Sequence, residues 1–122
     1  QGTTELPLWP EGRVKAPPKL KGPEQISDAT SRASGERWTM LQNVAVPTLT
    51  VFPPKAPANG TAVMVVPGGG YRVLAMDLEG SEICDWLNAQ GITCALLKYR
   101  VPASGPNWDP DSNCRDNPTV PM

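Results

Sequence analysis

The feature that most constrains the fold is a strand–helix–strand pattern over residues 61–98. The pattern begins with TAVMVV, a continuous apolar run that is typical of a strand covered on both faces, as in a parallel sheet. Residues 78–91 follow as a predicted helix, with Asp77 as its N-cap and Gly91 as its C′ residue. A second apolar strand, ITCALLK, ends the unit. Such a unit joins two parallel strands through a helical crossover.

The predicted helix has one mostly apolar face, which we expect to pack against the sheet. Glu79 and Glu82 lie in its first turns, where the positive end of the helix dipole favours carboxylates. The expected buried face follows the spacing i, i+3, i+4, i+7 and consists of Ile83, Trp86, Leu87 and Gln90.

The residues before this unit divide into an arm and a strand. Residues 1–42 contain five prolines and show no sustained periodicity, so we predict an extended, proline-rich N-terminal arm. Residues 43–122 are predicted to be the N-terminal part of a domain. Within them, residues 44–52 alternate in the manner of a half-buried strand. Pro47 confines that strand to a sheet edge or delays its start.

The C-terminal segment, residues 101–122, is predicted to be a long irregular loop, and loops of this length are uncommon in compact domains. One strand–helix–strand unit with one further strand leaves parallel strands with open edges and an uncovered face. Roughly 60 assignable residues cannot bury the surface that such strands require. We therefore expect an incomplete folding unit, whose C-terminal segment is a second chain.

Three consecutive glycines, Gly68, Gly69 and Gly70, follow Pro67 at the end of the first apolar strand. Glycine lets the backbone approach a ligand closely, and open α/β sheets bind ligands at the carboxyl ends of their strands. A dinucleotide fingerprint would need Gly or Ala at position 73, where Val73 stands, and the P-loop signature is absent. The remaining chemistry for such a loop is an oxyanion hole built from backbone N–H groups.

The segment PGGGY at residues 67–71 resembles the oxyanion loop of the α/β-hydrolase superfamily, in the variant of the acetyl xylan esterase-like carbohydrate esterases. The flanking pieces PTLTVFPP, EGSEICDWLNAQGI and LLKYRVP agree, and the resemblance covers about residues 44–122. It implies a three-layer αβα fold with a mainly parallel sheet, of which this chain is the N-terminal part. It also implies a serine esterase that hydrolyses acetylated polysaccharide or small esters through an acyl-enzyme.

The resemblance assigns the oxyanion role to the backbone amides of Gly69, Gly70 and Tyr71, and makes Tyr71 a substrate-binding residue as well. In the superfamily, the serine, the acid and the histidine follow this loop in that order. The chain has no histidine and no G-x-S-x-G elbow. We therefore expect the triad in the missing C-terminal part, and we expect this chain alone to be inactive.

A second candidate for substrate contact is Trp108, since aromatic faces suit sugars. Its loop is rich in Asp, Asn and Pro, so solvated turn chemistry is the alternative interpretation.

Composition limits the ligands and partners. The formal net charge of −1 gives no basic surface for nucleic acid or anionic lipid, and no apolar run approaches the length of a membrane span. Cys84, Cys94 and Cys114 fit no zinc pattern, so no metal or cofactor is expected. They are either two buried thiols and a loop thiol, or one disulfide in a secreted protein. The resemblance favours a secreted or periplasmic protein.

Two alternatives to a carbohydrate esterase stay open. One is a non-catalytic carbohydrate-binding or interaction module, in which the glycine run is only a tight turn and Trp9, Trp38 and Trp108 form a binding face. The other is a lipase or peptidase of the same fold. A downstream G-x-S-x-G elbow would favour an enzyme, and glycan binding without that elbow would favour the module.

Overall fold

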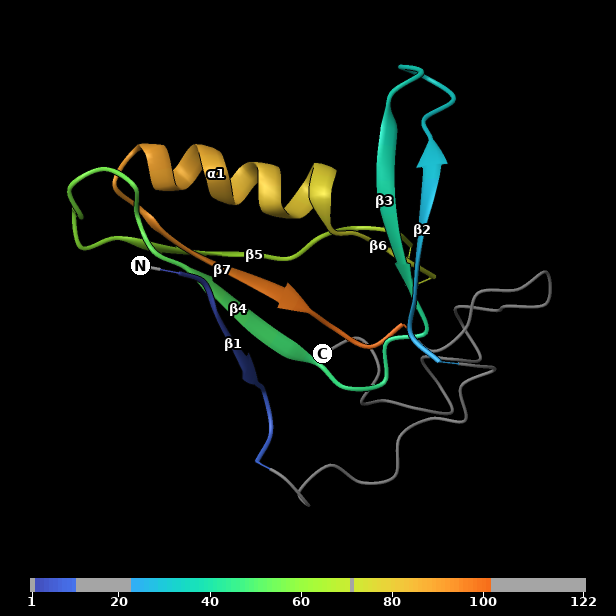
Figure 1. The fold of residues 1–122 in the computed structure, drawn as a ribbon, viewed down its shortest axis with the longest axis horizontal. Coiled ribbons are helices and arrows are strands. Elements are labelled where there is room, and N and C mark those ends of the chain that lie inside the picture. Colours follow the sequence, from blue (N-terminus) through green and yellow to red (C-terminus); the bar gives the residue numbers. More distant parts are fainter. Residues whose placement is uncertain (1, 11–22, 71, 102–122) are drawn as a thin grey trace.

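The computed structural model describes residues 2–10, 23–70 and 72–101. The strands in these ranges form two sheets (Figure 1). In the same ranges, the helical residues form one continuous segment, residues 77–89, which lies in sequence between the last two strands. In chain order the elements are β1 (Thr4–Pro7), β2 (Gln25–Thr30), β3 (Arg37–Gln42), β4 (Thr48–Phe52), β5 (Ala62–Val65), β6 (Leu74–Ala75), the π-helical turn η1 (Asp77–Ser81), α1 (Glu82–Ala89) and β7 (Thr93–Lys98).

The first sheet has the strand order β1-β4-β7-β5 and mixes both pairing directions. β5 and β7 are parallel neighbours with α1 between them in sequence, as the strand–helix–strand pattern predicts. β4 pairs antiparallel with β7 on one side and antiparallel with β1 on the other. β4 therefore lies inside the sheet. Pro47 directly precedes it, so this proline delays the start of the strand, where its missing N–H costs no ladder bond.

The second sheet is antiparallel, with the order β2-β3-β6. β2 and β3 form a hairpin whose turn includes Gly35 at φ 74°, a conformation that glycine adopts at little cost. The hairpin extends away from the first sheet in Figure 1. β6 is only two residues long and returns the chain from the glycine loop to β3.

The predicted fold class, the N-terminal part of a mainly parallel three-layer αβα fold, is wrong. Only the β5–β7 pair is parallel among the strand pairs of the described residues, and α1, with eight residues, is the one α-helix there. The prediction extended one parallel pair to a whole sheet. It also assigned no strand to residues 1–42, where the structure has β1, β2 and β3, and each of these strands pairs antiparallel with its neighbours.

One core lies between α1 and the first sheet. Its buried members are Val65, Cys84, Leu87, Cys94 and Leu96. Cys84 and Cys94 form a disulfide that ties α1 to β7, and both are fully buried. Of the two interpretations of the cysteines, the structure has the disulfide; Cys114 lies outside the described residues.

The face of α1 that packs on the sheet differs from the predicted one. Cys84, Leu87 and Asn88 are buried, whereas Ile83 and Trp86 are exposed by 40% and 64%. Asn88 is buried because its side-chain Nδ2 donates to the carbonyls of Phe52 and Ile92, both at 3.0 Å. The helix ends as predicted, since Gly91 follows it with φ 79°.

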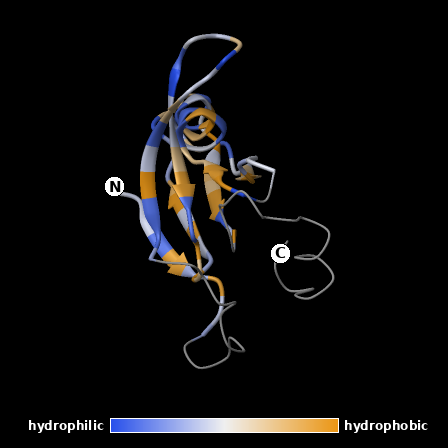
Figure 2. Ribbon diagram, turned by 90° about the vertical axis from the view of Figure 1, so that its right-hand side faces the viewer, coloured by the Kyte–Doolittle hydropathy of each residue, from blue (hydrophilic) through white to orange (hydrophobic). Residues whose placement is uncertain are grey.

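A second core joins the two sheets and consists of Leu41, Val44, Leu74, Tyr99 and Val101. Met76 packs against both cores, so the segment between β6 and η1 connects them. Figure 2 shows hydrophobic and hydrophilic residues alternating along the strands of the first sheet. β5 is less covered than predicted, because Met64 is 58% exposed, so the prediction that this strand is covered on both faces is wrong.

Candidate active site

The glycine loop follows β5 at the carboxyl end of the parallel pair. Pro67 is fully buried, Gly68 and Gly69 are half-buried and Gly70 is exposed. The Tyr99 hydroxyl donates to the Pro67 carbonyl at 2.6 Å. Because Tyr99 comes directly after β7, the neighbouring parallel strand fixes the start of the loop.

The two carbonyls that follow are also hydrogen-bonded. The Gly68 carbonyl accepts from the Ala75 N–H at 3.0 Å. The Gly69 carbonyl accepts from the N–H groups of Arg72 and Val73 at 3.1 and 3.3 Å. All these peptide bonds are trans, and in a trans peptide the N–H points opposite to the C=O. The Gly69 N–H therefore points away from Ala75, which holds the Gly68 carbonyl. In the same way, the Gly70 N–H points away from Arg72 and Val73, which hold the Gly69 carbonyl.

The amides of Gly69 and Gly70 are available as donors. No hydrogen bond joins either N–H to an acceptor within residues 2–10, 23–70 and 72–101. Both residues have backbone conformations that favour glycine, with φ 148° at Gly69 and 62° at Gly70. Two consecutive unbonded N–H groups on a loop without side chains are the type of donor pair that stabilises an oxyanion.

The turn η1 supplies two carboxylates that reach back to earlier segments. Glu79 Oε2 accepts from the Gly68 N–H at 2.7 Å. Asp77 Oδ2 accepts from the Thr39 N–H of β3, and Asp77 Oδ1 from the Leu78 N–H, both at 2.7 Å. The predicted N-cap role of Asp77 is thus replaced by a tie to β3, and Ser81 stands at the N-cap of α1.

The electrostatics of Asp77 follow from these bonds. Partial burial acts to raise the pKa of Asp77, but the hydrogen bonds from Leu78 and Thr39 together outweigh it, and the pKa lies below its ordinary value. The carboxylate is therefore ionised at neutral pH and holds η1 against the second sheet.

Two of the predicted site residues are placed and two are not. Gly69 and Gly70 lie together in the loop just described. Tyr71, predicted as a donor and a substrate contact, and Trp108, predicted as a substrate contact, lie outside the described residues. Their roles, and the oxyanion role of the glycines, stay predictions.

Sequence reasoning missed two residues that hold the loop, Tyr99 and Glu79. Tyr99 had a detectable signal, because residues that follow two parallel neighbouring strands come to the same sheet edge. Glu79 was interpreted only as an acidic residue near a helix start, and its contact with Gly68 depends on how η1 turns back toward β5.

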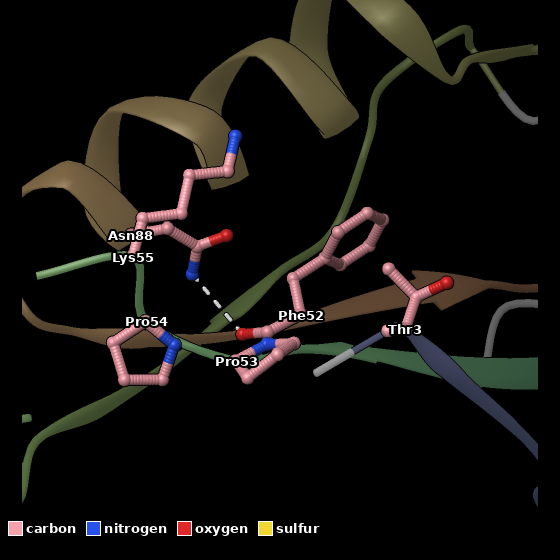
Figure 3. A pocket seen from close by; sticks show the side chains of 7 residues that line it. Thr3, Phe52, Pro53, Pro54, Lys55 and Asn88 are labelled. Carbon is pink, nitrogen blue, oxygen red and sulfur yellow. Dashed lines mark hydrogen bonds between the residues drawn. The ribbon is translucent and has the colours of Figure 1, made fainter.

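A surface pocket of about 540 Å³ lies at the opposite end of the first sheet (Figure 3). Its lining residues are Gly2, Thr3, Phe52, Pro53, Pro54, Lys55 and Asn88. Phe52 pairs with Cys94 near the start of β7, whereas the glycine loop follows the far end of β5. The Asn88 side chain points to the Phe52 carbonyl in Figure 3, so its amide is engaged in holding β4 and α1 together.

Among the residues that the structure describes, no group of three or more His, Cys, Asp or Glu side chains is gathered in a way that could hold a metal ion. None of the helices in this part of the chain has the length and apolar character needed to cross a membrane.

The comparison with known proteins gives one partial match. An acetylxylan esterase of Xylanibacter ruminicola is 44% identical over 54 residues, which make up 44% of this chain and 11% of that protein. The chain therefore spans only a small part of the length of the relative that it matches. No protein-family model matches the chain, and no solved structure matches it significantly. The match supports a distant relationship to an esterase.

Proposed function

We propose that this chain supplies the oxyanion loop of a serine esterase that removes acetyl groups from polysaccharide. The observation that carries the proposal is the pair of Gly69 and Gly70 amides, which have no acceptor among the described residues, while the carbonyls of Pro67, Gly68 and Gly69 are each hydrogen-bonded. The partial identity with an acetylxylan esterase supports the same activity and the same substrate class.

The chemistry needs two things from this loop. When a nucleophile attacks an acetyl carbonyl, the carbonyl oxygen becomes negatively charged, and donors that already point at that position stabilise it without reorganisation. The absence of side chains at Gly69 and Gly70 lets the acetyl carbonyl approach the backbone within hydrogen-bond distance. Each such donor contributes about 10²–10³ in rate.

The nucleophile and its base are proposed to lie outside this chain. A serine needs an adjacent base to attack an ester, and this sequence has no histidine and no G-x-S-x-G elbow. We propose that a C-terminal segment of the same hydrolase, present as a second chain, brings the serine, the acid and the histidine to the glycine loop. We also propose that the protein is secreted or periplasmic.

The test is hydrolysis by the full-length protein that contains this chain. The proposal predicts release of acetate from acetylated xylan and of 4-nitrophenol from 4-nitrophenyl acetate. Long-chain 4-nitrophenyl esters and peptide amides are the matched substrates for a lipase or a peptidase. Binding of xylan with no release of acetate would refute the esterase and favour the carbohydrate-binding module, and faster turnover of the long-chain esters or amides would refute the acetyl preference.

A further inference from the structure

The peptide unit that joins Pro67 to Gly68 is held at both of its polar ends. Its carbonyl oxygen accepts from the Tyr99 hydroxyl at 2.6 Å. Its N–H, which belongs to Gly68, donates to Glu79 Oε2 at 2.7 Å. A planar unit fixed at two opposite ends cannot rotate about the chain axis without breaking one of these bonds.

These two hydrogen bonds matter because the next residues, Gly69 and Gly70, have no side chains that could set their backbone conformation. Glycine populates left-handed and right-handed backbone regions about equally, so a glycine run adopts many loop shapes unless its neighbours fix it. The Gly68 and Gly69 amides belong to consecutive peptide units that meet at the Gly68 Cα, so the orientation of the first unit sets the starting direction of the second. The bond from the Gly68 N–H to Glu79 Oε2, at 2.7 Å, lies at the short end of the usual range for N–H···O bonds.

We propose that Glu79 is a positioning residue, whose carboxylate holds the Gly68 amide and so orients the amides of Gly69 and Gly70 for the oxyanion. This inference rests on the proposed function. Glu79 does not itself contact the substrate in this account. Its effect passes through the backbone of the loop.

Two substitutions remove the contact from opposite sides. Glu79→Ala deletes the acceptor. Gly68→Ala places a Cβ only 2.5 Å from Glu79 Oε2, so the end of the Glu79 side chain has to move away while the acceptor stays in the protein. Glu79→Gln keeps a side-chain oxygen at the same length and is the rescue variant. Glu82→Ala removes an exposed carboxylate from the next turn and is the matched control.

The first measurement is steady-state ester hydrolysis by the full-length protein. Glu79→Ala and Gly68→Ala are expected to lower kcat by about 10- to 100-fold, less than the 10²–10³ for outright loss of an oxyanion donor, with little change in KM. The double variant should lose no more than the worse single variant, because both remove one contact. Glu79→Gln should recover most of kcat, and Glu82→Ala should match the unaltered protein.

The second measurement does not depend on activity. In protein labelled with [¹⁵N]glycine, Glu79→Ala is expected to speed hydrogen exchange at the Gly68 amide and to shift the signals of Gly69 and Gly70, whereas Glu82→Ala leaves all three unchanged. If the unaltered protein hydrolyses no ester, the proposed function fails, and the amide signals alone decide whether Glu79 holds the loop. If the protein is active and Glu79→Ala keeps full kcat or leaves the three signals unchanged, the inference about Glu79 is overturned and the proposed function stands.

Discussion

Alanine at Gly69 and alanine at Gly70 should differ sharply in cost, although the residues are adjacent. A Cβ at Gly69 would lie 1.9 Å from the Val73 carbonyl oxygen, at a φ of 148°. The strained backbone costs about 1–3 kcal/mol. Moving the loop also breaks the two hydrogen bonds to the Gly69 carbonyl, at about 0.5–1.5 kcal/mol each. The free energy of unfolding should therefore fall by about 2–6 kcal/mol in Gly69→Ala.

Gly70→Ala is the matched control. A Cβ there meets no atom within 4 Å, and only its φ of 62° is unfavourable, which costs about 1–2 kcal/mol. Urea unfolding followed by tryptophan fluorescence measures both variants. Equal losses of stability at the two positions, or a loss below about 1 kcal/mol at Gly69, would show that the loop does not have the described conformation.

Three further predictions concern the framework around the loop. Replacing Cys84 and Cys94 by alanine should lower the free energy of unfolding by about 2–3 kcal/mol, given their sequence separation of 10, as measured by urea unfolding without reductant. Asn88→Ala leaves two backbone carbonyls without their donor and should cost about 2–4 kcal/mol, whereas Asn59→Ala, at an exposed turn, should cost under about 1 kcal/mol in the same assay. The lowered pKa of Asp77 contributes stability that is complete above the pKa of the unfolded chain and is lost as the pH falls through the folded pKa, so unfolding from about pH 5 down to pH 2 should show a smaller acid loss in Asp77→Asn than in the unaltered protein.

Local signals predicted the part of the fold that carries the candidate site. The apolar runs around residues 61–98 and the glycine at position 91 depend on burial and on backbone conformation, which the sequence shows directly. The parallel pairing of β5 with β7 follows from the helix between them. The position of Gly69 and Gly70 after β5 could therefore be predicted without the structure.

The antiparallel strands could not be predicted in the same way. β1 is four residues long, ends at a proline and is exposed along its length, so it shows no hydrophobic alternation. β2 is likewise mostly exposed. Such strands form because a partner backbone is near, and that partner is set by tertiary structure. Without these strands, the sequence indicates only the parallel pair, and the sheet that it predicts is mainly parallel.

The buried face of α1 could not be read from hydropathy either. Asn88 is polar, yet it is buried with two side-chain hydrogen bonds to backbone carbonyls, and Cys84 is small, yet it is buried in a disulfide with Cys94. The turn η1 directly before α1 is π-helical, but the predicted face lies wholly within α1 and its C-cap, where the large apolar residues Ile83 and Trp86 point hydropathy to the wrong side. The same turn places Glu79 beside Gly68, a contact between residues 11 positions apart.

The measurement that tests the central claim most directly combines a phosphonate inhibitor with amide signals of the glycine loop. A 4-nitrophenyl alkyl phosphonate leaves a tetrahedral anionic adduct on an esterase serine, in the place of the oxyanion intermediate. The account predicts one such adduct in the full-length protein, detected by mass, and large downfield shifts of the ¹⁵N-labelled Gly69 and Gly70 amide protons when it forms. An adduct that leaves both amide signals where they were would contradict the oxyanion role of this loop, and the absence of any adduct would contradict a serine esterase.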